Sequence, residues 1–122
     1  MSNLNLNEVL RAYISCRKNK RNTVNQIKFE LNVENNLYNI YTELKNETYR
    51  PGRSICFVVT YPKLREIFAA DFKDRIVHHL LVARLEPYYE KRFIYDSYAC
   101  RKDKGAHKAV LRLRKFSRQN KY

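Results

Sequence analysis

The sequence predicts an α+β fold in which helices pack on a small antiparallel β-sheet or hairpin. Apolar residues recur at helical spacing within the first fifty residues and again after residue 70. Between these regions, residues 54–60 are β-branched and aromatic, which is typical of a strand. Apolar residues make up 44% of the 122 residues, which is enough for a folded core and excludes wholesale disorder.

Two helices are expected before residue 50. Asn5 is placed to cap the first, with Glu8 returning a hydrogen bond to the amide of the cap. Thr23 and Gln26 suggest the same arrangement for a second, longer helix that kinks near Asn35-Asn36. The first apolar face consists of Leu6, Val9, Leu10, Tyr13 and Ile14, and the second of Ile27, Leu31, Leu37, Ile40, Tyr41 and Leu44.

A β-hairpin is expected after the turn signal Tyr49-Arg50-Pro51-Gly52. Residues 54–60 form its first strand and residues 64–69 return as the second. Pro62 belongs at the turn, because proline cannot donate a hydrogen bond to a strand ladder.

Two further helices follow the hairpin. Asp71 is expected to cap the first of them, with Asp74 also favourable near the positive helix end, and Pro87 is expected to end or kink it. Residues 93–100 are expected to be extended, and Gly105 precedes the last helix. That helix has an apolar face of Ala109, Val110, Leu113 and Phe116, and a basic face of Lys108, Arg112, Arg114, Lys115 and Arg118.

The charge of the chain favours a polyanionic partner. The formal net charge is +13 and the isoelectric point is about 9.9, so nucleic acid is the first candidate. The basic connector 16–22 is equally consistent with a solvated turn and with a phosphate contact. The three cysteines form no C-x-x-C pair, and no apolar run is long enough to cross a bilayer, so we expect a cytoplasmic chain with no membrane partner.

Lys63 and Arg65 are candidates for binding phosphates. Residues two apart on a strand project to the same face. A lysine is a mobile point charge and an arginine a planar fork, a pair suited to the several oxygens of a triphosphate. The alternative is an edge strand that charge protects from aggregation.

The wider pattern resembles the fingers region of the bacterial retroelement type of reverse transcriptase, the family of group II intron, retron and diversity-generating retroelement enzymes. The residues that carry the resemblance are Lys63, Arg65-Glu66-Ile67, Phe68-Ala69-Ala70, Asp74-Arg75-Ile76-Val77, Leu85-Glu86-Pro87, Ser97-Tyr98-Ala99-Cys100-Arg101 and Lys104-Gly105-Ala106-His107. The Ala-Cys pair and His78-His79 look closest to the diversity-generating branch. Phe68-Ala69-Ala70 and Asp103 depart from the group II pattern.

The resemblance implies a role for each matching position. Lys63 and Arg65 would contact the phosphates of the incoming deoxynucleoside triphosphate. The residues expected near the RNA template are Ala69, Ala70, Phe72 and Arg75, together with Arg101, Lys102 and Lys104 on the basic turn. The implied partners are the RNA template, the RNA/DNA duplex, the deoxynucleoside triphosphate and the remainder of the polymerase.

The resemblance also implies that binding and catalysis belong to different parts of the polymerase. Polymerisation in this family uses palm carboxylates that hold Mg²⁺, and neither the first of these nor a Tyr-x-Asp-Asp turn occurs before Tyr122. We therefore expect an N-terminal helical extension over 1–50 and a fingers subdomain over 51–122, forming one compact unit without catalytic or metal-binding residues. By itself this part is expected to be inactive and prone to self-association through uncovered apolar surface.

Two other classes of protein fit parts of the sequence. A stand-alone basic RNA-binding module would bind RNA without any dependence on deoxynucleotide. A small metal nuclease would use Asp71, Asp74 and His78. His78 and His79 point about 100° apart on a helix and do not easily share one ion, and His107 reads as a local hydrogen-bonding residue.

Overall fold

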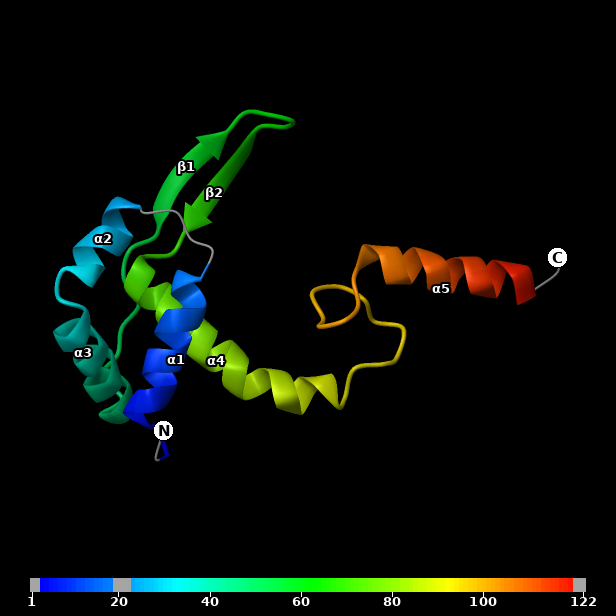
Figure 1. Ribbon diagram of the computed structural model, residues 1–122. Coiled ribbons are helices and arrows are strands. Elements are labelled where there is room, and N and C mark those ends of the chain that lie inside the picture. The colour runs from blue at the N-terminus through cyan, green and yellow to red at the C-terminus, as the bar shows by residue number, and fades with distance from the viewer. Residues whose placement is uncertain (1–2, 19–22, 120–122) are drawn as a thin grey trace. The chain divides into compact units, whose positions relative to one another are not determined.

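The protein has the predicted α+β fold, as the computed structural model of residues 3–18 and 23–119 shows (Figure 1). Within these residues helices accompany one two-stranded antiparallel sheet. The elements are α1 (Leu6–Arg17), α2 (Val24–Glu30), α3 (Val33–Lys45), β1 (Ile55–Val59), β2 (Arg65–Ala69), α4 (Phe72–Glu90) and α5 (Ala106–Gln119). The chain divides into two compact units, Met1–Glu86 and Pro87–Tyr122, so the helices before residue 50 and the hairpin after it belong to the same unit.

Helix α1 begins with the predicted capping box. The Asn5 side chain accepts a hydrogen bond from the Asn7 amide (3.1 Å), and the Asn5 amide donates to Glu8 Oε2 (3.4 Å). The predicted buried face of this helix was wrong except for Val9, because the helix buries Val9, Ala12 and Cys16. Leu6, Leu10 and Ile14 are exposed. Small side chains at 12 and 16 let the neighbouring helices approach closely, which a search for large apolar residues overlooks. Residues 19–22 of the basic connector lie outside the described residues.

The predicted long second helix is in fact two helices. The break lies at Leu31 and Asn32, not near Asn35-Asn36, and Asn32 has non-helical backbone angles (φ −135°, ψ 46°). Asn36 does not break the helix. Its side chain spans the break at Leu31 and Asn32 by donating a hydrogen bond to the Phe29 carbonyl (2.8 Å). Thr23 is the N-cap residue of α2, as predicted, but its side chain makes no capping bond, and Gln26 is buried and donates to Glu30 Oε1 (3.1 Å) instead of completing a capping box.

Strands β1 and β2 form the predicted hairpin. Ile55 pairs with Ala69, Phe57 with Ile67 and Val59 with Arg65. The hairpin extends away from the helices of its unit (Figure 1), and its side chains are largely exposed on both faces. Exposed apolar residues such as Phe68 therefore reflect a hairpin that has no layer packed over it within the described residues.

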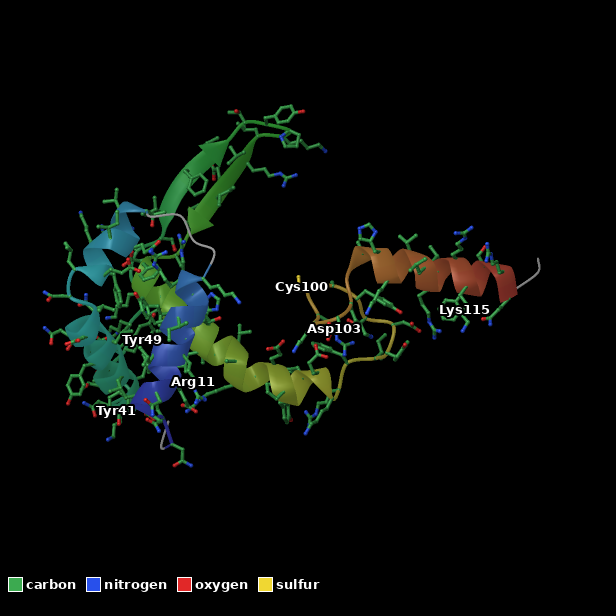
Figure 2. The ribbon with its side chains drawn as sticks, in the orientation of Figure 1. Arg11, Tyr41, Tyr49, Cys100, Asp103 and Lys115 are labelled. Carbon is green, nitrogen blue, oxygen red and sulfur yellow. The ribbon has the colours of Figure 1, made fainter. Side chains whose placement is uncertain are left out.

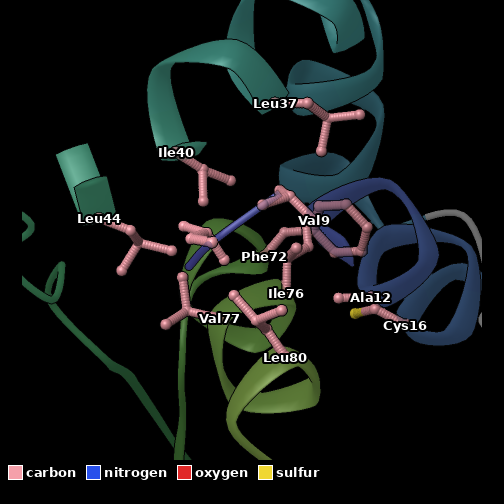
Figure 3. Packing of buried hydrophobic residues seen from close by; sticks show 11 residues of the cluster. Val9, Ala12, Cys16, Leu37, Ile40, Leu44, Phe72, Ile76, Val77 and Leu80 are labelled. Carbon is pink, nitrogen blue, oxygen red and sulfur yellow. The ribbon is translucent and has the colours of Figure 1, made fainter. Parts of the chain in front are cut away.

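The core of the first unit lies between α1, α3 and α4 (Figure 3). Ile76 and Leu80 of α4 pack there with Val9 and Ile40, and an aromatic cluster of Tyr13, Phe29 and Phe72 borders it. The whole buried apolar set is Leu4, Val9, Ala12, Cys16, Leu37, Ile40, Leu44, Phe72, Ile76, Val77 and Leu80. Helix α4 therefore positions the hairpin by being anchored in the core directly after β2.

In the second unit, α5 is the predicted last helix, and none of its residues is buried. Pro87 does not end α4, which continues to Glu90. The segment predicted to be extended, 93–100, contains turns instead of a strand, and Cys100 and Asp103 have positive φ angles of 53° and 56°. Side-chain contacts within this loop, described below, hold these turns. Among the described residues, no helix is both long and apolar enough to cross a membrane.

Candidate nucleic-acid interface

Lys63 and Arg65 lie at the exposed end of the hairpin. Arg65 is the first residue of β2, whereas Lys63 lies in the loop before it, so strand alternation does not set the direction of the Lys63 side chain. Both residues are exposed. Within the described part of the chain neither cation has a hydrogen-bond or ion-pair partner, so both charges are available to an anion.

A pocket of about 260 Å³ lies at the other end of the hairpin. It brings together three of the predicted template residues, Ala69, Phe72 and Arg75, beside the apolar side chains of Ile55 and Phe57. The floor is rigid, because the buried ring of Phe72 packs edge-on against the rings of Tyr13 (6.4 Å) and Phe29 (5.3 Å).

Arg75 and Ala70 are joined at the junction of β2 and α4. The Nε of Arg75 donates to the Ala70 carbonyl at 2.8 Å. This bond holds the arginine against the strand end and leaves its terminal guanidinium nitrogens for a further acceptor. Ala70 thus contributes its main-chain carbonyl, and not its side chain, to the placement of Arg75.

Asp74 has a role that the sequence analysis missed. Its side chain is 3% exposed and accepts hydrogen bonds from the Tyr49 hydroxyl (2.5 Å) and the Gly52 amide (2.9 Å). Burial and the bond to Asp74 together raise the pKa of the Tyr49 phenol well above its ordinary value. The carboxylate therefore ties the segment before β1 to the start of α4, and helix capping does not account for its position.

Asp71 also faces a partner from another element. Its Oδ1 accepts from Asn25 Nδ2 at 3.1 Å, and the Asp71 carbonyl accepts from the Arg75 amide. The sequence suggested that Asp71 and Asp74 act together at the start of the helix. In the structure their side chains make separate tertiary contacts. Glu8 and Asp74 are each the third residue of a helix, but Glu8 both completes a capping box and binds Arg84, whereas Asp74 binds Tyr49 and Gly52, and sequence spacing does not distinguish these roles.

Arg101 occupies the centre of the loop in the second unit. Its guanidinium binds both carboxylate oxygens of Glu90 (2.7–3.1 Å) and donates to the carbonyls of Ile94 (3.1 Å) and Ser97 (3.2 Å). The side chain is 10% exposed. These contacts give Arg101 a positioning role within the loop, and a contact with RNA stays a prediction.

Lys102 and Lys104 differ in their surroundings. Lys102 is exposed, and within the described residues it has no ion-pair partner. The Lys104 ammonium donates to the Tyr95 carbonyl and lies over the rings of Tyr95 (4.4 Å) and Tyr98 (4.9 Å). Among the described residues neither lysine forms a salt bridge, although the Lys104 charge, after the hydrogen bonds of Arg101 and Arg112, helps to lower the pKa of Glu90 and of Asp96.

The three histidines, His78, His79 and His107, differ in their surroundings. His78 and His107 are exposed, and Nδ1 of His79 lies 3.4 Å from Ser15 Oγ. Within the described residues, no three His, Cys, Asp or Glu side chains are grouped as metal ligands. Asp74 is already bound to Tyr49 and Gly52, which argues against the nuclease hypothesis built on Asp71, Asp74 and His78.

The loop of the second unit is expected to loosen in acid. Hydrogen bonding to Arg101 lowers the pKa of Glu90 below 4.5, and hydrogen bonding to Arg112 lowers the pKa of Asp96 below 3.8. Such groups stabilise the fold above their ordinary pKa, and that contribution is lost as the pH falls through the lowered values. Near-UV circular dichroism of the tyrosines should therefore change below about pH 4.

A matched pair of variants tests this expectation. Glu90→Gln/Asp96→Asn should remove most of the acid-induced change, whereas Glu34→Gln/Glu66→Gln, which neutralises two exposed acids elsewhere, should leave it intact. Equal behaviour of the two variants would show that overall charge, and not these ion pairs, governs the transition.

Comparison with protein families and with curated proteins finds no match: no protein-family model matches the chain, and no curated protein matches it significantly. A function therefore has to be inferred from the residues and geometry of this chain.

Proposed function

We propose that this chain is the N-terminal and fingers part of an RNA-directed DNA polymerase, which holds the phosphates of the incoming deoxynucleoside triphosphate and the RNA template. The observation that supports the proposal is a pair of exposed cations at one end of the hairpin, Lys63 and Arg65, which have no partner among the described residues. A pocket lies at the other end of the same hairpin. The sequence resemblance to reverse transcriptase fingers supports the same reading.

Strand β2 links the two halves of the proposed grip. Arg65 is its first residue and Ala69 its last, a separation of about 13 Å along an extended strand. Phosphates at the cations and a base at the pocket would both be held by one rigid strand, so the nucleotide and the template would be aligned with little loss of freedom on binding. The apolar wall of Ile55 and Phe57 suits the face of a base.

In the parent enzyme, Mg²⁺ held by carboxylates of another part would neutralise the triphosphate and align the primer hydroxyl. The residues of this chain would bind and orient. Lys63 and Arg65 would hold phosphate oxygens, Arg75 would contact the template backbone, and Lys102 and Lys104 would meet template phosphates further along.

The proposed partners and location follow from the same reading. The exposed apolar residues of the hairpin, such as Phe68, would be covered by the remainder of the polymerase or by self-association. A reducing cytoplasm fits the thiols, since Cys56 and Cys100 are exposed and no disulfide forms among the described residues.

Substitution of the hairpin cations tests the proposal. Titration of a deoxynucleoside triphosphate into the chain should shift amide resonances of residues 61–67. Lys63→Ala/Arg65→Ala should weaken this binding about tenfold, because two charge-assisted contacts are lost.

The control removes the same charge from the same unit. Lys28→Ala/Lys45→Ala changes exposed lysines of α2 and α3 and should leave the affinity near that of the unmodified chain. If both double variants lose affinity equally, the triphosphate is attracted by net charge alone and the assigned site is wrong.

A stand-alone RNA-binding module is the second candidate. It is favoured by the concentration of positive charge after residue 86, far from the hairpin in sequence. The two candidates differ in coupling: for a polymerase part, a deoxynucleoside triphosphate should raise the affinity for RNA, whereas a simple RNA-binding module should show no such effect.

A further inference from the structure

The second unit carries most of the net charge of the protein. From Pro87 to Tyr122 the sequence has eleven Lys and Arg residues against three acidic residues, which is +8 of the total +13. Two of the acids are already paired, Glu90 with Arg101 (2.7 Å) and Asp96 with Arg112 (2.9 Å). Most cations in the described part of this unit (residues 87–119) therefore form no salt bridge, and a polyanion is the natural complement.

A pocket of about 320 Å³ lies between the loop and α5 of this unit. Lys108, Arg112 and Lys115 line it from one face of α5, because residues four and seven apart on a helix share a face. The loop contributes Tyr95, Tyr98 and Lys104, together with one acidic residue, Asp103. Figure 2 shows Lys115 on α5 and Asp103 in the preceding loop. Cations and aromatic rings thus meet in one concave site.

Arg112 is held in place before any ligand arrives. Its Nε binds Asp96 Oδ1 (2.9 Å), and its guanidinium lies 4.4 Å from the Phe116 ring centroid and 5.2 Å from that of Tyr95. The Tyr98 hydroxyl donates to the same Asp96 oxygen (3.2 Å). A planar group fixed in this way loses little freedom when a ligand stacks on it.

The lysines of the pocket keep donors free for phosphate oxygens. Lys108 donates to the Asp103 carbonyl (2.5 Å) and Lys104 to the Tyr95 carbonyl. A carbonyl does not neutralise an ammonium, and each ammonium has three donors. Lys115 is exposed and has no ion-pair partner among the described residues.

Tyr95 supplies a surface for stacking. Its side chain is 70% exposed although two cations lie over its ring, which fixes the ring without covering it. An exposed ring beside a row of cations is the arrangement that binds single-stranded nucleic acid, where the base stacks and the cations hold the backbone. An acidic peptide would match the charge but would leave the ring without a partner.

We propose that this pocket binds a segment of single-stranded RNA, with a base stacked on Tyr95 and neighbouring phosphates held by Lys108 and Lys115. The inference rests on the proposed function in one respect, that RNA is the nucleic acid concerned. It adds a second site, on α5, to the hairpin grip at Lys63 and Arg65.

Fluorescence anisotropy of a short labelled oligo(A) RNA, measured over a range of KCl concentrations, tests the site. Lys108→Ala/Lys115→Ala should weaken binding and reduce the salt slope by about 1.4, the value for two phosphates of a single strand. Tyr95→Ala should weaken binding about tenfold with the slope unchanged, and Tyr95→Phe, which keeps the ring, should restore it.

Arg114→Ala/Arg118→Ala is the control, since it removes the same charge from α5 at positions outside the pocket. An equal loss of salt slope in this control would overturn the site in favour of a diffuse basic surface. Binding of a polyglutamate peptide or of duplex RNA as tightly as oligo(A) would overturn the stacking role. Displacement of oligo(A) by AMP at the same nucleotide concentration would mean a mononucleotide site instead of a strand.

The outcomes separate this inference from the proposed function. Oligo(A) binding that depends on Tyr95 and Lys108, without triphosphate binding at Lys63 and Arg65, would support the pocket and reject the polymerase assignment. Triphosphate binding at the hairpin with oligo(A) binding insensitive to Tyr95 and Lys108 would do the reverse.

Discussion

Asp74→Ala is expected to lower the free energy of unfolding by about 3 kcal/mol, because it leaves two donors without an acceptor. The Tyr49 hydroxyl and the Gly52 amide both donate to this carboxylate, which is 3% exposed. Removing a charged acceptor from such a site costs more than removing an ordinary hydrogen bond, since the donors cannot turn to water without opening the structure. Urea unfolding followed by far-UV circular dichroism measures the change.

Asp71→Ala is the matched control for this prediction. Asp71 lies three residues earlier and is only half-buried, and among the residues that the structure describes its side chain accepts a hydrogen bond from Asn25 alone. Its removal should cost about 1 kcal/mol. Tyr49→Phe should fall between the two, because the Gly52 amide keeps its acceptor. If Asp71→Ala and Asp74→Ala destabilise equally, both carboxylates act only on the helix terminus and the tertiary role of Asp74 is wrong.

The Asp74 contacts also matter for the proposed function. They connect the segment before β1 to the start of α4, while Arg75 holds the end of β2 through Ala70. Both ends of the hairpin are thereby attached to one helix of the core. Loss of Asp74 should therefore weaken triphosphate binding at Lys63 and Arg65 indirectly, although neither cation is altered.

Arg101→Ala is expected to abolish the ordered loop between α4 and α5. One guanidinium joins the Glu90 carboxylate to the carbonyls of Ile94 and Ser97, and these contacts link turns that strand pairing does not support. Amide hydrogen exchange of residues 93–105 should accelerate at least about tenfold, while that of the α1, α3 and α4 core should stay the same. Arg101→Lys should not restore protection, since a lysine lacks the planar fork that binds several acceptors at once.

Lys102→Ala is the adjacent control for Arg101→Ala. It removes the same charge at an exposed position and should leave the exchange rates unchanged. For RNA binding the expectation is different: Lys102→Ala should reduce the salt slope, whereas Arg101→Ala should weaken binding by disordering the loop. Equal hydrogen exchange in the two variants would show that Arg101 contributes only its charge.

Elements governed by neighbours in sequence were predicted well. The Asn5–Glu8 capping box, the hairpin over 54–69 and the last helix after Gly105 were all found as expected. The capping box depends on hydrogen bonds within three residues, while the hairpin and the last helix follow from residue composition, apolar periodicity and turn residues that the sequence displays. Of the basic candidates, Lys63 and Lys102 are exposed and Lys104 is half-buried, and their contacts with a nucleic acid stay predictions.

Features that the pattern of residue types does not reveal were not predicted. The helix break lies at Leu31 and Asn32, where the Asn36 side chain donates to the Phe29 carbonyl, and the buried face of α1 depends on neighbouring helices that pack on the small side chains of Ala12 and Cys16. Thr23 has the residue type of a cap but makes no side-chain capping bond, and the Gln26 side chain that would return a bond to the Thr23 amide donates to Glu30 instead. Tyr49 and Gly52, the two donors to Asp74, belong to the predicted turn before β1. They lie more than twenty residues from Asp74, and nothing in the sequence indicates that they contact it.

The sequence by itself determined the α+β class, the hairpin, the basic character of the surface and the positions that resemble a polymerase grip. Only the tertiary structure decided which charged residues are exposed and which are internal ties. Lys63 and Arg101 are both cations in matching motifs, yet the first has no partner among the described residues and the second is enclosed by Glu90 and backbone carbonyls. The physical reason is that a charged side chain stays exposed or becomes buried according to the acceptors that the fold brings near it. The residue type does not contain that information.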